Sequence, residues 1–417
     1  AARLAFDLAD EAGMPAVLLL ALGGHQGGHD GLSLLEIGLA DLVGGDDADR
    51  PGRAIVAAAG NSGGCQDHAV GDVGSGEAME IVLEVAREDG SLAVDVEVWY
   101  PPEVSLEVGL RTPSAQRVVP VPPGEQRWEA GASARVGVAN APAGPDPLSG
   151  DRQAVISLRS QIQGAVEPGL YRITLEGEGP FDAYLSWTSS EQLGGAASFR
   201  SPIEPDGTLT VPGTSEALIV VGATVSRSAW VDEGGRPFQD DRFRPGAVAS
   251  YSGSGPTRSG ARKPDLVAPG HAVLAALGRD AEPPSPTSVF TPRSSFLPQR
   301  YRVVSPGDRA ALWGTSVAAP HVAGAAALLL ERDPSLDQRA LRATLVASAR
   351  TDRGARGRGW SPRWGYGELD VQAALSLLAG GFGDEASPET SAFGVAEDVV
   401  APGGCTVVTV VPRDGSG

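Results

Sequence analysis

The sequence of 417 residues has very few cysteines: Cys65 and Cys405 are the only two, and they lie far apart. Two distant cysteines form neither a disulfide framework nor a cluster of metal ligands. Aromatic residues make up only 5% of the chain. No apolar stretch approaches the roughly 20 residues that cross a bilayer. The composition therefore excludes a disulfide-stapled scaffold and contains no membrane span.

Basic residues are also scarce, since 33 Lys and Arg stand against 52 Asp and Glu and give a net charge of −19. A chain this acidic repels phosphate groups, which excludes nucleic acid and anionic membrane surfaces as partners. Nearly all the cations are Arg, and Ala, Gly and Pro are abundant, which indicates a GC-rich bacterial genome. With 41% hydrophobic residues, the chain can build the cores of two or three domains.

The first 61 residues alternate between helical and strand patterns. Residues 1–12 predict a helix with Leu4, Leu8 and Ala12 on one face, ended by Gly13. The apolar run 16–22 predicts a strand buried on both faces of a parallel sheet. A second helix follows, for which Ser33 and Glu36 form a capping box and Leu35, Leu39 and Leu42 an apolar face. A second buried strand over 54–59 completes a βαβ pattern, hence a doubly wound α/β core.

Between residues 78 and 187 the pattern changes to period two, without helical periodicity. The segment "EIVLEVAREDGSLAVDVEVWY" predicts a hairpin around Glu88, Asp89 and Gly90, and "LYRITLEGEGPFDAYLSW" predicts another. We therefore predict an inserted antiparallel β-sandwich. The α/β pattern returns with a strand over 217–221 and helices over 316–332, 335–349 and 371–378.

These patterns divide the chain into five parts. The predicted parts are an α/β core in two pieces, 1–69 and 214–380, the inserted sandwich 70–213, a linker 381–390, and short β-type sequence at 391–417, which resembles the start of a small Ig-like β domain. Residues 280–300 are rich in Pro and Ser and predict a long surface loop.

The motif "GTSVAAPHVAGAAALL" at residues 314–329 carries the strongest chemical signal. Gly314 permits a tight turn, and Ser316 then stands at the N-terminus of a small-residue helix. There its free backbone N–H and the helix dipole favour a developing negative charge. Gly-Thr-Ser alone also fits a helix with a Ser cap, but the whole string in a strand–helix context indicates a nucleophile.

This string resembles the serine motif of the subtilisin-like serine proteases, the subtilases. "IVAAAGNSG" at 55–63 resembles their oxyanion-hole segment, which implies that Asn61 is the oxyanion donor. The resemblance also implies substrate-binding roles for Ala58, Ala59 and Gly60 in one wall of the primary specificity pocket, and for Ala21, Leu22 and Gly23 in "LALGG". "YSGSGPTRSGARKPDLVAPG" at 251–270 and "WGYGELDVQAAL" at 364–375 resemble further subtilase segments.

The resemblance implies a serine endopeptidase that acts through an acyl-enzyme on Ser316. Subtilases also need an Asp and a His that lie upstream of the "LALGG" strand, the His in a His-Gly-Thr-His motif. Neither is present, and the five His of this chain read as structural or solvated: His25, His29, His68, His271 and His321. His29 is the least implausible substitute base, but it would require a different geometry.

Two explanations of this gap stay open. The chain starts with Ala1 inside a helix and ends abruptly in "VVPRDGSG", which favours an N-terminally truncated fragment that is inactive alone. The alternative is a catalytically inactive subtilase-like binding or scaffold protein.

The separation of Asn61 from Ser316 leaves room for the predicted insert, which resembles the jelly-roll insert of clostridial Csp-like subtilases. The insert could rigidify the protease or recruit substrate, but a packing module without a ligand is preferred. The family implies a protein or peptide substrate and a secreted or cell-surface location. Calcium is common in the family, but no loop here identifies its ligands. The sequence does not indicate an oligomeric state.

Overall fold

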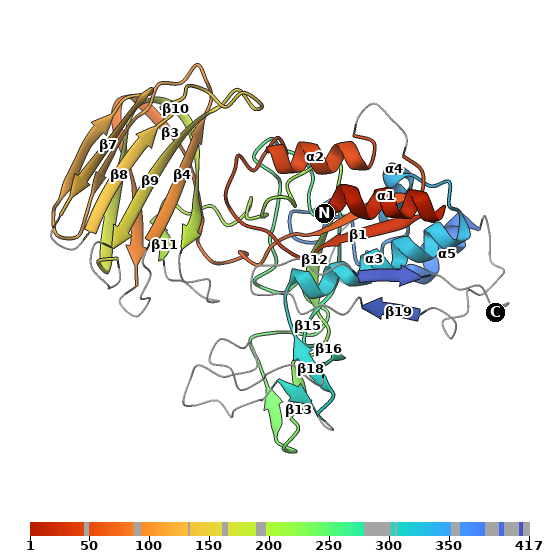
Figure 1. Ribbon diagram of the computed structural model, residues 1–417. Coiled ribbons are helices and arrows are strands. Elements are labelled where there is room, and N and C mark those ends of the chain that lie inside the picture. Colours follow the sequence, from red (N-terminus) through yellow and green to blue (C-terminus); the bar gives the residue numbers. More distant parts are fainter. Residues whose placement is uncertain are drawn as a thin grey trace.

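The computed structural model describes residues 1–45, 50–86, 93–131, 134–160, 166–188, 197–278, 302–304, 307–351 and 359–379, together with the backbone of 392–395 and 408–411. A parallel four-stranded sheet forms its centre, in the order β1-β2-β12-β15 (Figure 1). These strands span Ala16–Leu20, Arg53–Ala58, Ile219–Val225 and Leu266–His271. The helices are α1 (Ala2–Ala12), α2 (Leu34–Leu42), α3 (Thr315–Arg332), α4 (Gln338–Ser348) and α5 (Val371–Leu378).

Alternate residues of the central strands pack into two different cores. Ala54 and Val56 of β2 join the cluster that contains α3, α4 and α5. Ile55 and Ala57 face the other way, into the cluster that contains Phe6 of α1 and Leu39 of α2. Since helices cover both faces of one parallel sheet, the predicted doubly wound α/β core is confirmed.

The local helix signals are also confirmed. Gly13 ends α1 in the left-handed conformation with a φ of 64°. Ser33 and Glu36 form the predicted capping box at the start of α2. In α4, Leu341 and Leu345 are buried.

The predicted apolar faces of the first two helices are only partly buried. Leu4 and Leu8 of α1 and Leu35 of α2 are exposed, while Leu39 is buried. Strand β1, predicted to be buried on both faces, has four half-buried residues and buries only Leu18. The reason is its position, because β1 pairs with β2 on one side and lies at the edge of the described sheet. Periodicity identified these apolar faces but not what covers them.

Nine antiparallel strands lie between β2 and β12 in the sequence, and we call residues 68–201 the antiparallel region (Figure 1). They are β3 (His68–Val85), β4 (Ala93–Tyr100), β5 (Glu107–Arg111), β6 (Arg117–Val121), β7 (Glu125–Ala130), β8 (Ala134–Asn140), β9 (Arg152–Ser160), β10 (Gly169–Thr188) and β11 (Ala197–Ser201). The antiparallel strand character of the insert is confirmed; the sandwich arrangement and the domain boundaries stay predictions.

Both predicted hairpins in this region are wrong. Strands β3 and β4 do not pair with each other, because β10 lies between them and pairs antiparallel with both. The second segment is not a hairpin but the single long strand β10, whose pairing with β3 shifts register between Gly177 and Gly179. A Cβ on Gly177 would lie 2.3 Å from the Ser105 carbonyl oxygen, so these glycines serve a bulge and a close approach rather than a turn.

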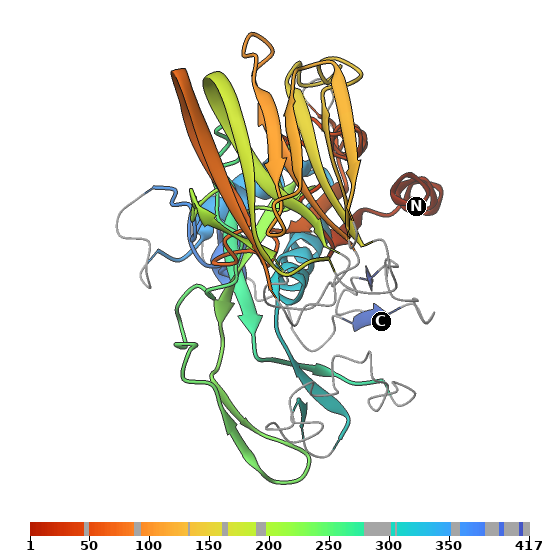
Figure 2. The ribbon, with the colours of Figure 1, turned by 90° about the vertical axis from the view of Figure 1, so that its left-hand side faces the viewer.

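Shorter strands extend from the far end of the parallel sheet, as Figures 1 and 2 show. They are β13 (Ala229–Val231), β14 (Pro237–Gln239), β16 (Val273–Ala276), β17 (Val303–Val304) and β18 (Arg309–Leu312). Backbone strands β19 (Ala392–Val395) and β20 (Val408–Val411) pair antiparallel. The predicted loop 280–300, the linker 381–390 and the rest of the predicted Ig-like domain 391–417 lie outside the described residues. No helix in the described ranges is long and apolar enough to cross a membrane.

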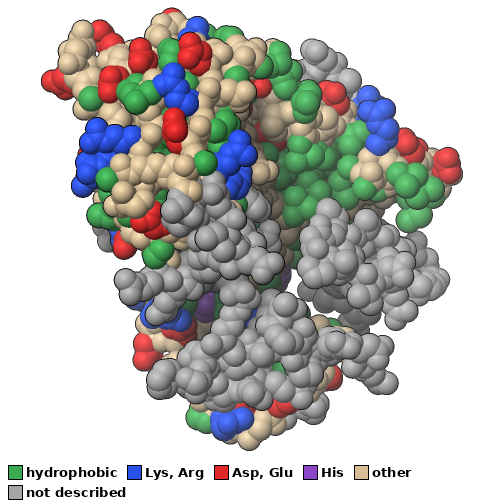
Figure 3. Space-filling model, turned by 60° about the vertical axis from the view of Figure 1, so that its left-hand side comes forward, with side chains coloured by type: hydrophobic (Ala, Val, Ile, Leu, Met, Phe, Trp, Pro, Cys, Tyr) green, Lys and Arg blue, Asp and Glu red, His purple; other side chains and the backbone are tan. Residues whose placement is uncertain are grey.

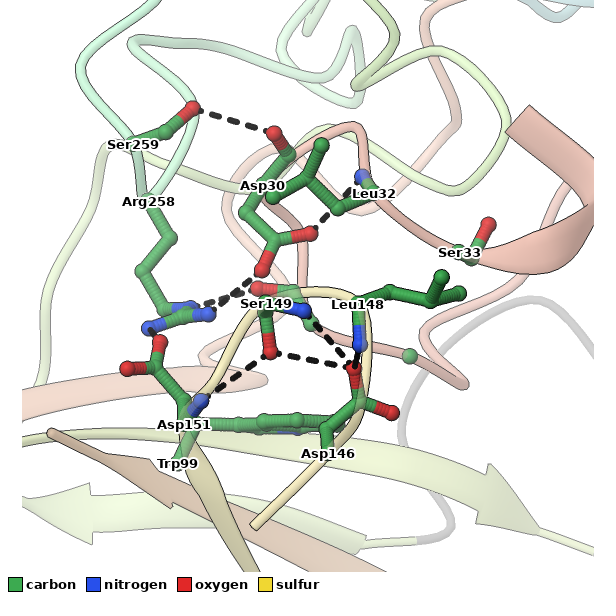
Figure 4. A network of polar contacts seen from close by, with 12 residues as sticks. Asp30, Leu32, Ser33, Trp99, Asp146, Leu148, Ser149, Asp151, Arg258 and Ser259 are labelled. Atoms are coloured by element: carbon green, nitrogen blue, oxygen red, sulfur yellow. Dashed lines mark hydrogen bonds and ion pairs between the residues drawn. The ribbon is translucent and has the colours of Figure 1, made fainter. Parts of the chain in front are cut away.

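Arg258 joins the antiparallel region to the core (Figure 4). Its guanidinium donates to Asp30 in the loop after β1 at 2.7 Å and to Asp151 in the antiparallel region at 2.5 Å. It also lies over the Trp99 ring, 5.5 Å from the ring centroid. The Arg258 side chain is only 11% exposed, so its removal would leave two shielded carboxylates without their cation.

We expect Arg258→Met to lower the free energy of unfolding by about 3 kcal/mol, because a charge left unpaired in a shielded site is costly. Urea denaturation at pH 7 measures this loss. The matched control is Arg172→Met, which breaks a pair with Glu80 whose side chains are 42% and 48% exposed and should cost less than about 1 kcal/mol. Equal losses in the two variants would contradict the bridging role of Arg258.

Candidate active site

The predicted nucleophile Ser316 is the second residue of α3. The helix is capped by Gly314, whose φ of 136° is open to glycine and strained for other residues. A Cβ at Gly314 would also lie 3.3 Å from Asn61 Nδ2. The Ser316 backbone N–H has no hydrogen-bond partner in the described ranges, as expected for the first turn of a helix. The serine therefore presents a hydroxyl and a free N–H at one helix end.

Thr315 fastens this helix end to the end of β2. Its backbone N–H donates to Asn61 Oδ1 at 2.9 Å, and its hydroxyl donates to the same oxygen at 3.1 Å. The Thr315 hydroxyl also accepts from the Gly60 N–H at 3.1 Å. With Oδ1 held in this way, the Nδ2 end of the Asn61 carboxamide is left as a donor with no partner among the described residues.

A second contact holds the turn before the serine. The Gly314 N–H donates to the Gly270 carbonyl at 2.9 Å and to the Tyr251 hydroxyl at 3.1 Å. The Tyr251 hydroxyl in turn donates to the Gly270 carbonyl at 2.9 Å. Burial raises the pKa of Tyr251 well above its usual value, so the hydroxyl stays protonated as a donor. The helix end is thereby joined to β15 as well as to β2.

The predicted substrate-binding segments converge on the same helix end. The Ser316 hydroxyl donates to the Ala21 carbonyl at 3.0 Å, across almost 300 positions of sequence. Residues Ala21, Leu22 and Gly23 are exposed, whereas Ala58 and Ala59 are buried and Gly60 is half-buried. Every residue predicted for the site thus lies on one of three segments that meet at α3.

Two residues of this arrangement were missed by the sequence analysis. Thr315 lies inside the recognised motif, but its pattern gives no sign that it fixes Asn61. Thr210 lies in a segment without periodicity, and nothing in its context identifies it. In the structure its backbone N–H donates to the Ala59 carbonyl at 3.1 Å, which places it beside the predicted pocket wall.

None of the five His forms a hydrogen bond to Ser316. His25 contacts Ser62 at 2.7 Å, His29 contacts the Leu209 carbonyl at 2.9 Å, and His68 contacts Asp182 at 3.1 Å. His321 contacts the Val317 carbonyl within α3 at 3.1 Å. His29, the substitute base considered from sequence, is buried, and that burial lowers its pKa well below the usual value. These four His side chains therefore form hydrogen bonds to groups other than Ser316.

The loop after β1 is held by the antiparallel region. His29 stacks on Tyr184 of β10 with ring centroids 3.7 Å apart, and His68 stacks on the same Tyr184 with ring centroids 4.4 Å apart. The Gly27 N–H donates to the buried Glu97 carboxylate at 3.1 Å. Burial raises the pKa of Glu97. The segment that continues the substrate-binding strand is therefore fixed by residues far away in sequence.

His271 occupies an aromatic pocket near the start of α3. Its ring stacks on Phe243 at 3.8 Å and lies 5.8 Å from the ring of Trp313. Both ring nitrogens are buried without a partner in the described part of the chain. Burial lowers the pKa of His271 to about 4, and the Arg242 charge acts in the same direction while Asp240 opposes it. The imidazole is therefore neutral at pH 7.

Among the described residues, no group of three or more His, Cys, Asp or Glu is placed to hold a metal ion. Two cavities of about 900 and 1010 Å³ lie elsewhere, and no predicted site residue lines either of them. The arrangement around Ser316 is thus one of a hydroxyl, a backbone N–H and a carboxamide.

Comparison with known proteins shows which family this chain resembles. Residues 195–367, which include Ser316, match the subtilase family model. Over these residues the chain is a subtilase. It is 36% identical over 135 residues to the serine protease AprX of Bacillus subtilis, a match covering 32% of this chain and 25% of AprX. It is also 36% identical over 104 residues to the subtilisin-like protease SBT3 of Solanum lycopersicum, covering 24% of this chain and 12% of SBT3. The matches thus span a quarter or less of these relatives.

The subtilase fold extends over most of the chain. The structure of the Clostridium perfringens CspB protease superimposes with a TM-score of 0.68 and 23% sequence identity. The match covers 90% of this chain and 70% of that one. At this identity the likeness shows a shared fold.

We expect Thr315→Val to destabilise this subtilase by about 1 kcal/mol or more. The change keeps the side-chain shape but leaves the Gly60 N–H without its acceptor, and a hydrogen bond of this kind contributes about that much. Chemical denaturation measures the loss. The control is Thr344→Val, whose hydroxyl bonds only to the Ala340 carbonyl inside α4 and should matter less. A larger loss in the control would contradict the fastening role of Thr315.

We expect His271 to make the folded state less stable as the pH falls from about 6.5 to about 4. In this interval the unfolded chain binds a proton at this residue and the folded chain does not. The shift corresponds to a loss of up to ~3 kcal/mol, which is complete below pH 4. Thermal unfolding against pH should show a weaker dependence in His271→Phe than in the wild type. His321→Gln, which changes an exposed His, should keep the wild-type slope; identical curves for all three would refute the expectation.

Proposed function

We propose that this chain carries the nucleophile and oxyanion hole of a serine endopeptidase. The observation that carries the proposal is the meeting of the Ser316 hydroxyl, the Ser316 N–H and the Asn61 carboxamide at one helix end within a subtilase fold. In the proposed reaction Ser316 Oγ attacks a peptide carbonyl carbon, and the carbonyl oxygen becomes an oxyanion. The Ser316 N–H and Asn61 Nδ2 donate to that oxygen, and the helix dipole adds to their effect.

Asn61 is suited to this role because its orientation is fixed before substrate binds. Donors that need no reorganisation stabilise the transition state more than the ground state. Loss of one such donor reduces turnover by about 10²- to 10³-fold in enzymes of this type. The bond from Thr315 to Oδ1 supports the proposal because it fixes the Asn61 carboxamide and leaves Nδ2 as the end that can donate to a substrate.

A proton acceptor completes the reaction. It takes the Ser316 proton as the Oγ–C bond forms and returns that proton to the leaving amine as the C–N bond breaks. Water then hydrolyses the acyl-enzyme. Since the five His of this chain contact other groups, we propose that the base and its orienting carboxylate come from a polypeptide segment outside residues 1–417, so that this chain alone has little activity.

The edge of the parallel sheet at β1 bears on this part of the proposal, although strand β20 also lies close to β1. Strand β1 is paired on one side among the described strands, and its last residues lead directly to Ala21, which contacts Ser316. Hydrophobic side chains gather beside α1 on this side of the molecule (Figure 3), where Leu4 and Leu8 are exposed. A segment docked here would bury apolar surface and bring a base toward the serine.

The substrate is a protein or peptide in this proposal, and the location is secreted or at the cell surface. The competing function is a subtilase-like binding or scaffold protein without catalysis. It is favoured only by the absence of a base near Ser316, whereas the ordered oxyanion donors favour catalysis.

We expect the full-length gene product to react with a fluorophosphonate probe at Ser316, because the probe requires an activated serine and an oxyanion hole. Ser316→Ala should abolish labelling, and Asn61→Ala should slow it by about 10²-fold or more. The control is Ser335→Ala, which changes an exposed serine that bonds to Asp333 and should label like the wild type. Labelling that survives Ser316→Ala, or a full-length protein that never labels, would overturn the proposal.

A further inference from the structure

Thr210 fills the space between the two predicted walls of the specificity pocket. A Cβ built on Gly23 would lie 2.3 Å from Thr210 Oγ1, and one built on Gly60 would lie 2.6 Å from both Oγ1 and Cγ2. Both distances are too short for real atoms, so the two glycines have no side chain where Thr210 has one. The Thr210 side chain therefore lies against both walls at once.

Thr210 is held in this position by its backbone. Its N–H donates to the Ala59 carbonyl at 3.1 Å, and its carbonyl accepts from the Gly213 N–H at 2.6 Å. The next residue, Val211, exchanges two hydrogen bonds with Gly24, at 2.9 and 3.1 Å. Withdrawal of the side chain would break contacts to both walls. The backbone hydrogen bonds therefore fix Thr210 in place, and its side chain forms the floor of the space between the two walls.

The Thr210 hydroxyl is also an unusual polar group. The residue is 6% exposed, and Oγ1 has no hydrogen-bond partner among the described residues. A buried hydroxyl without a partner is unfavourable, and native structures rarely retain one without a reason. The hydroxyl faces the space between Gly23 and Gly60, where it could bond to a group that enters that space.

This floor lies next to the proposed reaction centre. Gly60 directly precedes Asn61, and Gly23 follows two residues after Ala21, whose carbonyl accepts from Ser316. A substrate residue whose carbonyl is attacked by Ser316 would direct its side chain between these two segments. That residue, called P1, would meet Thr210 at a depth that leaves no room for a large side chain.

We propose that Thr210 determines the specificity of this subtilase by restricting P1 to small residues, namely Gly, Ala and Ser. Its methyl and hydroxyl groups exclude aromatic and long side chains by volume, and its unpartnered hydroxyl favours Ser over Ala. This inference rests on the proposed function, because it assumes that the peptide carbonyl lies at Ser316.

The test uses the full-length protein and peptide substrates that differ only at P1. The wild type should cleave the Ala substrate at least ~100-fold more efficiently than the Phe substrate, since even one methylene in a closed pocket changes kcat/KM by about 10- to 200-fold. Thr210→Gly should raise the ratio of Phe to Ala cleavage at least ~10-fold. Comparable cleavage of both substrates by the wild type, or an unchanged ratio in Thr210→Gly, would overturn the inference.

Two further variants separate volume from hydrogen bonding. Thr210→Val keeps the volume and removes the hydroxyl, so it should keep the preference for Ala over Phe and lose the preference for Ser over Ala. Thr210→Ser keeps the hydroxyl and removes only a methyl group. It replaces Thr210→Gly in the comparison of Phe and Ala cleavage if the glycine variant does not fold. A Ser preference that persists in Thr210→Val would overturn the role of the hydroxyl.

Binding of product-type peptides with a free terminal carboxylate separates this inference from the proposed function, because binding needs no turnover. Calorimetric titration should show tighter binding of the peptide ending in Ala than of the one ending in Phe. Size-selective binding without any cleavage would contradict the proposed function alone. Cleavage without size selectivity would contradict the Thr210 inference alone. Absence of both binding and cleavage would overturn both.

Discussion

The hydroxyl of Thr315 is the contact on which the whole arrangement around Ser316 depends. It accepts from the Gly60 N–H and donates to Asn61 Oδ1, so it joins the start of α3 to the end of β2. A single small side chain thereby decides where the helix begins and which way the Asn61 carboxamide faces. Preorganised donors of this kind are effective because they need no rearrangement when charge develops.

This junction requires α3 to come close to the sheet, and the composition of the helix allows it. Ala318, Ala319 and Ala323 are buried against strands of the parallel core. Larger side chains would lift the helix and break the short contacts from Thr315 to β2. The run of small residues in the serine motif is therefore a packing requirement that accompanies the chemistry.

The sequence analysis succeeded where neighbouring residues decide the structure. The capping box of Ser33 and Glu36 and the left-handed Gly13 depend on contacts within a few residues, and both are present. The sequence analysis was wrong where the structure depends on pairing between strands that are distant in sequence. Alternation predicts a half-buried strand but does not specify its neighbour, so the insertion of β10 between β3 and β4 could not be foreseen. Thr210 was missed for the same reason, since its importance comes only from Gly23 and Gly60.

The chain leaves the parallel core after β2 and forms the antiparallel region. It returns to the core at β12, close to the point where it left. Strands β2 and β12 pair directly, so the chain must return to the point that it left. The Glu204 N–H donates to the His68 carbonyl at 3.0 Å and closes this junction. The returning segment then passes Ala59 and supplies Thr210.

A short series of side-chain contacts therefore links the antiparallel region to Thr210, the floor of the proposed pocket. Tyr184 of β10 stacks on His29, and His29 contacts the carbonyl of Leu209, the residue before Thr210. The same His29 lies in the loop that continues from Gly23 and Gly24. Movement of the antiparallel region relative to the core would therefore shift the floor and one wall of the pocket together. The contacts that hold the antiparallel region to the core thus also hold the segment that carries Thr210.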